Sequence, residues 1–172
     1  MRDLAAACRI QPASLYAHFD GKDQILEELI RRYLDALVPA FREAADGPGN
    51  GAARLARMVE VSVELALTHR SEFLLFSNDW NYILRTPALA EVVENTEECR
   101  RLWSRVLEDG ARDGSLHADL DRGQVARAIF GTIRGMIDTS YDDMSSTASP
   151  QGAATAIAVL LHGLACSPRS RR

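Results

Sequence analysis

The sequence predicts an all-α protein. Apolar residues recur at the three- and four-residue spacing of amphipathic helices along the whole 172-residue chain. No stretch alternates apolar and polar residues cleanly between turn signals, as a half-buried strand would. Apolar residues make up 47% of the chain and charged residues 26%, so a sizeable core can form.

Two short helices are predicted at the N-terminus. The first covers Asp3–Cys8 and ends near Arg9-Ile10. The second covers Pro12–Phe19, because proline suits the first position of a helix, where its missing N–H costs nothing. Asp20-Gly21 ends this helix, and Asp20 is expected to cap the next one.

A long helix is predicted from Lys22 onward, running for about six turns with one broad apolar face. Its apolar stripe consists of Ile25, Leu26, Leu29, Ile30, Tyr33, Leu34, Leu37, Val38 and Phe41. Pro39 lies inside this pattern and is expected to kink or partly break the helix. The following segment, 46–51, holds three glycines and a proline and is predicted as a loop.

Three more helices are predicted after this loop. They cover 52–68, 71–84, and a segment that begins at Thr86-Pro87 and ends near Gly110 or Asp113. The third carries opposite charges four residues apart, which we interpret as a solvated face. These pairs are Glu97 with Arg101, Arg105 with Asp109, and Glu108 with Arg112.

The last two predicted helices favour a dimer surface. Asp121 and Gln124 have the spacing of a capping box, before an apolar stripe through Val125, Ile129, Ile133, Met136 and Ile137. Ser149-Pro150 opens the final helix, which is apolar on nearly all sides. Such a helix must be covered on two faces, one by its own domain and one by a second surface. Gly131 and Gly135 lie four apart on one face. We therefore predict a homodimer through these two helices, with a single large monomer core as the alternative.

Composition excludes several classes of protein. The formal charge is −4, with 20 basic and 24 acidic residues, which excludes massive electrostatic binding of nucleic acid but permits a local site. The longest apolar run, 153–165, is too short for a membrane span, and no secretory signal is present, so no membrane partner is expected. The widely spaced Cys8, Cys99 and Cys166 predict buried thiols in a reducing cytoplasm.

The second short helix has the form of a helix that enters the major groove of DNA. Leu15 and Phe19 should face inward, which leaves the other positions for a partner. Gln11 and Ser14 suit base edges, whereas Tyr16 and Lys22 suit phosphates. The candidate DNA-binding residues are Gln11, Pro12, Ala13, Ser14, Tyr16, Ala17, His18 and Lys22. Each one taken alone is equally compatible with an ordinary surface role.

The segment 3–26 resembles the helix-turn-helix signature of the TetR family of transcriptional repressors. The matching residues are Leu4-Ala5, Ser14-Leu15-Tyr16, His18-Phe19 and Lys22-Asp23. The resemblance implies a DNA-binding domain over 1–45 and a ligand-binding and dimerisation domain over 46–172. It also implies a homodimer that binds a palindromic operator and releases it when a small molecule shifts the long helix.

One departure from the family pattern lies at the front of the chain. Family members begin with a further helix that packs across the helix-turn-helix, and Met1 stands where that helix has already ended. We favour the interpretation that the sequence starts late or is a fragment. The alternative is a truncated, ligand-binding dimeric helical protein without tight DNA binding.

Bulky aromatic residues and a few polar groups indicate an effector pocket. The candidate ligand-binding residues are Phe76, Asp79, Trp80, Tyr82, Ile83, Arg85, Trp103, Phe130, Arg134 and Tyr141. The same aromatics are also compatible with a plain core. We predict a hydrophobic or amphipathic effector, such as an acyl-CoA or another lipid-like metabolite held by an arginine.

No enzyme motif occurs in the sequence. Paired carboxylates, a nucleophile with its base and a phosphate-binding glycine loop are all missing, and the four histidines lack partners at metal-ligand spacing. We therefore expect a protein that is not an enzyme and has no metal or cofactor.

Overall fold

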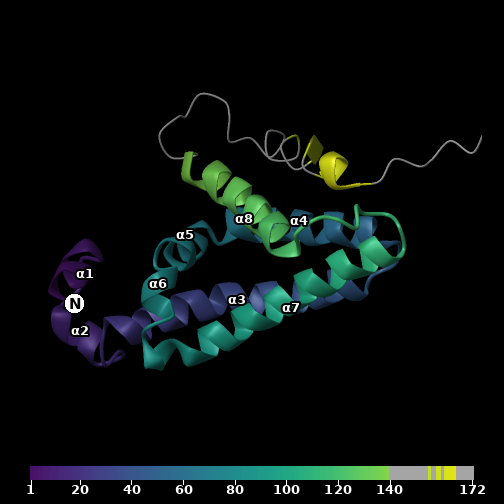
Figure 1. Ribbon diagram of the computed structural model, residues 1–172. Coiled ribbons are helices and arrows are strands. Elements are labelled where there is room, and N and C mark those ends of the chain that lie inside the picture. Colours follow the sequence, from purple (N-terminus) through teal and green to yellow (C-terminus); the bar gives the residue numbers. More distant parts are fainter. Residues whose placement is uncertain (140–154, 156–157, 160, 166–172) are drawn as a thin grey trace, which may run out of the picture.

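The computed structural model describes residues 1–139, 155, 158–159 and 161–165, and each regular element in this part of the chain is a helix (Figure 1). The predicted all-α class is confirmed. The elements are α1 (Arg2–Ala7), α2 (Pro12–Tyr16), α3 (Lys22–Asp46), α4 (Gly51–Thr68), α5 (Arg70–Asn78), α6 (Trp80–Ile83), η1 (Pro87–Leu89), α7 (Ala90–Arg112) and α8 (Arg122–Thr139). Among the described helices, none is both long enough and apolar enough to span a membrane.

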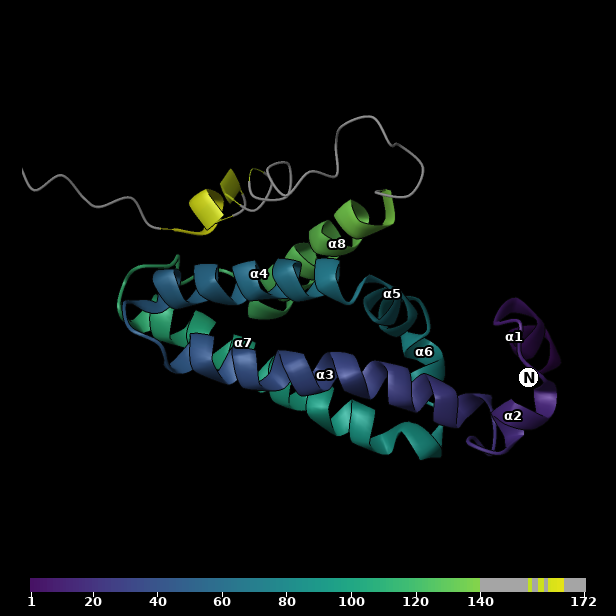
Figure 2. The ribbon, with the colours of Figure 1, turned by 180° about the vertical axis from the view of Figure 1, so that it is seen from behind.

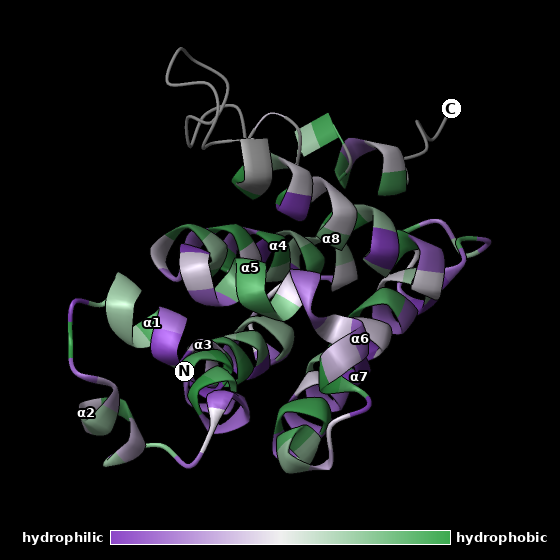
Figure 3. Cartoon of the chain, turned by 90° about the vertical axis from the view of Figure 1, so that its left-hand side faces the viewer, coloured by the Kyte–Doolittle hydropathy of each residue, from purple (hydrophilic) through white to green (hydrophobic). Residues whose placement is uncertain are grey.

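Helices α3, α4 and α7 pack against one another and form the centre of a bundle. In Figures 1 and 2, α3 and α7 run side by side, and α8 lies across the bundle on the side of α4. Figure 3 shows α3 and α7 end-on, with α1 and α2 off to one side of the bundle. The predicted apolar stripe of α3 is buried from Ile30 to Phe41, and Trp103 of α7 meets the ring of Phe41 edge-on at 5.7 Å.

Helix α3 continues through Pro39 from Lys22 to Asp46, so the predicted partial break does not occur. Proline cannot donate to the carbonyl of Asp35, four residues earlier. Both residues are exposed, and water can satisfy that carbonyl. The predicted loop over 46–51 is confirmed, since α3 ends at Asp46 and α4 begins at Gly51.

The start of α4 is held by the segment between α7 and α8. The Gly51 N–H donates to Oδ2 of Asp113 at 2.7 Å, and the Ala52 N–H donates to Oγ of Ser115 at 3.0 Å. Asn50 accepts a third hydrogen bond from the Ala53 N–H. These acceptors satisfy backbone donors that have no partner within the helix.

The predicted helix over 71–84 is two helices, because the chain turns at Asp79 between α5 and α6. The predicted Thr86 cap also differs. Thr86 precedes the 3₁₀ turn η1, but its hydroxyl donates to the Tyr82 carbonyl and not to the following turn. The regular α-helix α7 therefore begins at Ala90 and ends, as predicted, near residue 112.

The charged face of α7 makes contacts between helices as well as within its own turns. Glu108 pairs with Arg112, as predicted, at 3.3 Å. Arg105, however, reaches Asp46 at the end of α3, with 2.6 Å between nitrogen and oxygen. Two hydrogen bonds of 2.6 and 2.9 Å join Arg42 of α3 to Glu98. The interpretation as a simple solvated face was therefore incomplete.

The cysteines do not share one environment. Cys99 is buried, and desolvation raises the pKa of its thiol to about 12, which fits an unreactive core residue. Cys8 is exposed at the C-terminal end of α1, so the prediction of a buried thiol was wrong there. Cys166 lies outside the described residues.

At the start of α8 the Gln124 N–H donates to Oδ1 of Asp121 at 3.0 Å, which is one of the two hydrogen bonds of the predicted capping box. Val125, Ile129, Ile133 and Ile137 are buried against the bundle. Gly131 and Gly135 are exposed within the described structure. The predicted start of the final helix at Ser149-Pro150 lies outside the described residues. Further along, an isolated antiparallel bridge joins Ala165 to Leu116.

Candidate functional site

The α1–α2 unit is a short helical hairpin at the N-terminal end of α3. Ala5 is fully buried in it, and the Ile10 N–H donates to the Ala5 carbonyl at 3.0 Å. Arg9 has a φ of 56°, a left-handed conformation that makes the sharp turn between the helices possible. Leu4 and Ile10 expose 42% and 43% of their surface. The unit therefore presents apolar side chains to solvent.

Helix α2 is shorter than predicted, since it ends at Tyr16 and not at Phe19. The chain continues as a tight turn in which the His18 and Phe19 N–H groups both donate to the Leu15 carbonyl. Leu15 and Phe19 are half-buried, which agrees with their predicted inward orientation.

The candidate DNA-binding residues lie in α2, next to its two ends and at the start of α3. Gln11, Ala13, Ser14, Tyr16, Ala17, His18 and Lys22 are exposed, and Pro12 is half-buried. Tyr16 exposes 57% of its surface. The small side chains at positions 13, 14 and 17 would permit a close approach to a groove. Their contact with DNA remains a prediction.

The junction between α2 and α3 differs from the predicted cap. Gly21 is the N-cap residue of α3 and makes no side-chain cap. Asp20 instead donates its own N–H to Oε1 of Gln24 at 2.7 Å. The first turn of α3 is reached by Tyr82 of α6, whose hydroxyl donates to Oδ1 of Asp23 at 2.5 Å. The ammonium of Lys22 lies 5.3 Å from the centre of the Tyr82 ring.

The structure places the candidate effector residues in several groups. Phe76 and Trp80 meet edge-on at 5.4 Å, and Phe76 also lies 6.2 Å from the ring of Tyr33. Trp103 and Phe130 form a second aromatic contact at 5.8 Å, between α7 and α8. Arg134 donates to Oδ1 of Asn78 at 2.6 Å, which links α8 to the end of α5.

The remaining candidates are separate from these groups. Ile83 is fully buried, whereas Asp79 and Arg85 are exposed. Tyr82 turns to the start of α3, as described above. Tyr141 lies outside the described residues. The effector role of all ten residues remains a prediction.

The indole nitrogen of Trp103 is a buried donor without a partner in the described part of the molecule. Trp103 is 2% exposed, and its neighbours Phe41 and Phe130 offer only ring surfaces. Leaving a buried N–H unpaired costs about 1–3 kcal/mol. An oxygen acceptor that entered the bundle here would remove that cost.

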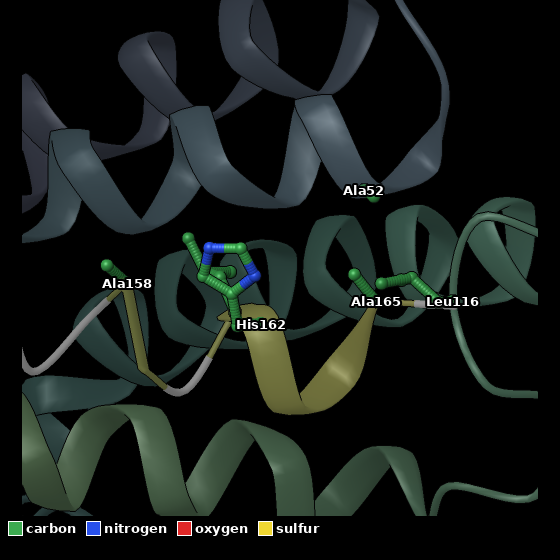
Figure 4. A pocket seen from close by; sticks show the side chains of 6 residues that line it. Ala52, Leu116, Ala158, His162 and Ala165 are labelled. Carbon is green, nitrogen blue, oxygen red and sulfur yellow. The ribbon is translucent and has the colours of Figure 1, made fainter. Parts of the chain in front are cut away.

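A pocket of about 290 Å³ lies elsewhere, between the start of α4 and the segment near residue 162 (Figure 4). Its lining consists of Ala52, Leu116, Ala158, Leu161, His162 and Ala165. None of the candidate effector residues is among them. The pocket therefore gives no support to the predicted effector set.

Sequence reasoning missed the partners of the candidate aromatics. Tyr33 of α3 faces the start of α5, where it meets the rings of His69 and Phe73 edge-on. Burial raises the pKa of Tyr33 well above its ordinary value. Its place in the apolar stripe of α3 was the available signal. The described residues contain no group of three or more His, Cys, Asp or Glu side chains placed to hold a metal ion.

Two models of known protein families match the chain, one in its N-terminal part and one in its C-terminal part. A family model described as the tetracyclin repressor-like C-terminal domain matches residues 48–138. A second model, described as bacterial regulatory proteins of the tetR family, matches residues 1–29.

Individual relatives are also named as transcriptional repressors of the helix-turn-helix type. The HTH-type transcriptional repressor KstR2 of Rhodococcus jostii is 32% identical over 121 residues, which are 70% of this chain and 59% of the relative. KstR2 of Mycobacterium tuberculosis is 29% identical over 132 residues, 77% of this chain and 66% of the relative. The chain thus spans less than two thirds of the length of these relatives. A solved structure of the ketosteroid transcriptional regulator KstR2 of Mycobacterium tuberculosis has a TM-score of 0.82 and 25% identity, covering 96% of this chain and 84% of that one.

Proposed function

Because the chain belongs to the TetR family of bacterial regulatory proteins, we propose that it is a ligand-responsive transcriptional repressor that binds a palindromic operator as a homodimer. The observation that carries this proposal is the exposure of the α2 side chains, close to the N-terminal end of α3. The polar and small side chains of α2 are free to enter a major groove there.

The DNA-facing residues divide into two roles. Gln11 and Ser14 stand at the N-terminal end of α2, where side chains reach base edges in a groove. Tyr16 and Lys22 carry a hydroxyl and an ammonium that suit phosphates. Because the chain as a whole is acidic, sequence-independent attraction is weak, and two copies of α2 would supply the selectivity.

The effector is proposed to be hydrophobic or amphipathic, with an oxygen acceptor. The aromatic contacts of Phe76 with Trp80 and of Trp103 with Phe130 support an apolar site. The indole N–H of Trp103, which has no partner among the described residues, supports an acceptor on the ligand. Arg134 supplies a cation for an acidic group. A relative described as a ketosteroid transcriptional regulator makes ketosteroids one suitable class of first probe, and acyl-CoA compounds, which the sequence favours, are a second class.

Selection from a random library of DNA duplexes tests the DNA-binding function. The full chain is expected to enrich one palindrome whose half-sites are centred about one helical turn apart. Gln11→Ala should enrich a family of sequences that is less defined within each half-site. Enrichment of no common sequence by the wild-type chain would contradict the proposal.

Tryptophan fluorescence and thermal stability test the effector. Steroid and acyl-CoA probes are titrated into the protein, and a ligand at about one hundred times its Kd should stabilise the folded chain by about 2.7 kcal/mol. The same ligand should release the selected duplex. Ligand binding that leaves DNA affinity unchanged would contradict the repressor mechanism.

A further inference from the structure

Tyr82 joins the bundle to the first turn of α3. Its hydroxyl donates to the Asp23 carboxylate at 2.5 Å, and its ring lies under the Lys22 ammonium at 5.3 Å. Tyr82 and Asp23 are 59 residues apart in sequence. Figures 1 and 2 both place α6 towards the N-terminal end of α3.

Helix α3 has an anchored part and a lightly held part. From Ile30 onward its inner side chains are buried, and the ion pairs of Arg42 with Glu98 and of Asp46 with Arg105 tie it to α7. Over 22–29, in contrast, no residue is fully buried. Movement of α3 relative to the bundle therefore costs least in these first two turns.

We propose that Tyr82 is a positioning residue. Its contacts with Asp23 and Lys22, which we call the latch, hold the first turn of α3 to α6 and thereby set the orientation of the α1–α2 unit relative to the bundle. A phenol that donates to a carboxylate makes a charge-assisted hydrogen bond, stronger than a neutral one. The ring adds a second attraction to the neighbouring Lys22.

The latch lies within reach of the candidate effector site. Trp80 and Tyr82 belong to the same four-residue helix, and the Trp80 ring packs on Phe76 of α5. A ligand that displaced Trp80 would move Tyr82 with it. This regulatory meaning rests on the proposed function, in which α2 reads DNA and the bundle binds the effector.

Hydrogen–deuterium exchange of the full chain, without DNA or effector, tests the latch. Tyr82→Phe keeps the ring and removes only the hydroxyl, and the side chain is partly exposed, so the fold should persist. The amides of residues 26–29 are expected to exchange about three to ten times faster, as the loss of one net hydrogen bond predicts. Asp23→Asn should act in the same direction, and amides in the middle of α4 and α7 should not change.

The double variant and a control complete the test. Tyr82→Phe combined with Asp23→Asn should exchange no faster than the more affected single variant, because both changes remove one bond. Asp35→Asn removes a carboxylate from an exposed position of the same helix and should leave residues 26–29 unchanged. Unchanged exchange in Tyr82→Phe, or fully additive effects in the double variant, would overturn the proposal.

The affinity for the selected duplex shows whether the positioning role of Tyr82 or the proposed repressor function has failed. If the wild-type chain selects a palindrome, Tyr82→Phe should change the affinity for it at least twofold, and an unchanged affinity would refute the positioning role. If the wild-type chain selects no sequence, the repressor function fails, and the exchange data still decide whether the latch exists.

Discussion

Gly51 and Gly110 permit α4 and α7 to meet backbone to backbone. A Cβ atom on Gly51 would lie 2.2 Å from the Gly110 Cα and 2.3 Å from its nitrogen. No side chain can move aside there, because both neighbouring atoms belong to the main chain. Position 51 therefore requires glycine because the backbones of α4 and α7 approach each other closely there, and not because of an unusual φ.

Gly51→Ala is therefore expected to destabilise the fold. Forcing the two helices apart should cost roughly 2 kcal/mol or more and lower the Tm by several degrees, as measured by calorimetry. Gly21→Ala adds the same methyl group where nothing lies within 4 Å, and it should lose less than about 1 kcal/mol, the contribution of an N-cap. Equal Tm values for the wild type and Gly51→Ala would refute this close packing.

Asp113 should make stability depend on pH in the acid range. Hydrogen bonds from the Ser115 side chain, and also from the Gly51 and Ser115 N–H groups, hold the pKa of its carboxyl below the ordinary value near 3.8. The stabilisation is fully present above about pH 4 and is lost as pH falls through the lower pKa of the folded state. Asp113→Ala should cost about 1 kcal/mol at neutral pH, as loss of a helix cap does.

Denaturant unfolding between pH 7 and pH 2.5 measures this effect. Asp113→Asn keeps a side-chain acceptor for the cap but should reduce the fall in stability on acidification. Asp119→Asn, in the same segment between α7 and α8, is the matched control and should follow the wild-type curve. An identical pH dependence for wild type and Asp113→Asn would contradict the assigned role.

Exposed positions of single residues were easier to predict than their distant partners. The outward position of Gln11 and Ser14 follows from the local spacing of Leu15 and Phe19. The contact of Tyr82 with Asp23 depends on how two elements pack, and no local pattern encodes it. The effector role of Tyr82 rests on its residue type alone and stays a prediction.

At the scale of elements, apolar periodicity located the long helices well and their ends less well. The stripe of α3 outweighed Pro39, because tertiary burial on one face stabilises the helix although one hydrogen bond is missing. The break at Asp79 has no glycine or proline to announce it. Local hydrogen bonding decides such ends, as in the early end of α2 at Tyr16.

Helix α8 allows a test of the predicted dimer surface. A Cβ atom on Gly131 would meet nothing within 4 Å in the single described chain, so Gly131→Leu should fold normally. If a second subunit packs on this face, the larger side chain should shift the sedimenting mass from twice 18.9 kDa towards 18.9 kDa. Ala118→Leu, at an exposed site before α8, is the control. A Gly131→Leu protein that remains as dimeric as the control would contradict the predicted interface.

At the scale of the whole molecule, the order of the helices was predictable and their coupling was not. The N-terminal match to a DNA-binding hairpin and the glycine-rich turn before Gly51 together indicated two units joined by one helix. The structure adds that most of this helix belongs to the core of the second unit. The movement that a ligand-responsive repressor requires is therefore expected near the start of α3.

The most direct test of the central claim is the affinity of the full chain for its selected palindrome, compared with the same duplex after both half-sites are scrambled. Fluorescence anisotropy at about 150 mM salt measures both. A sequence-specific repressor should bind the palindrome at least about a thousandfold more tightly. Equal affinity for the two duplexes would contradict the claim that this protein reads an operator through α2.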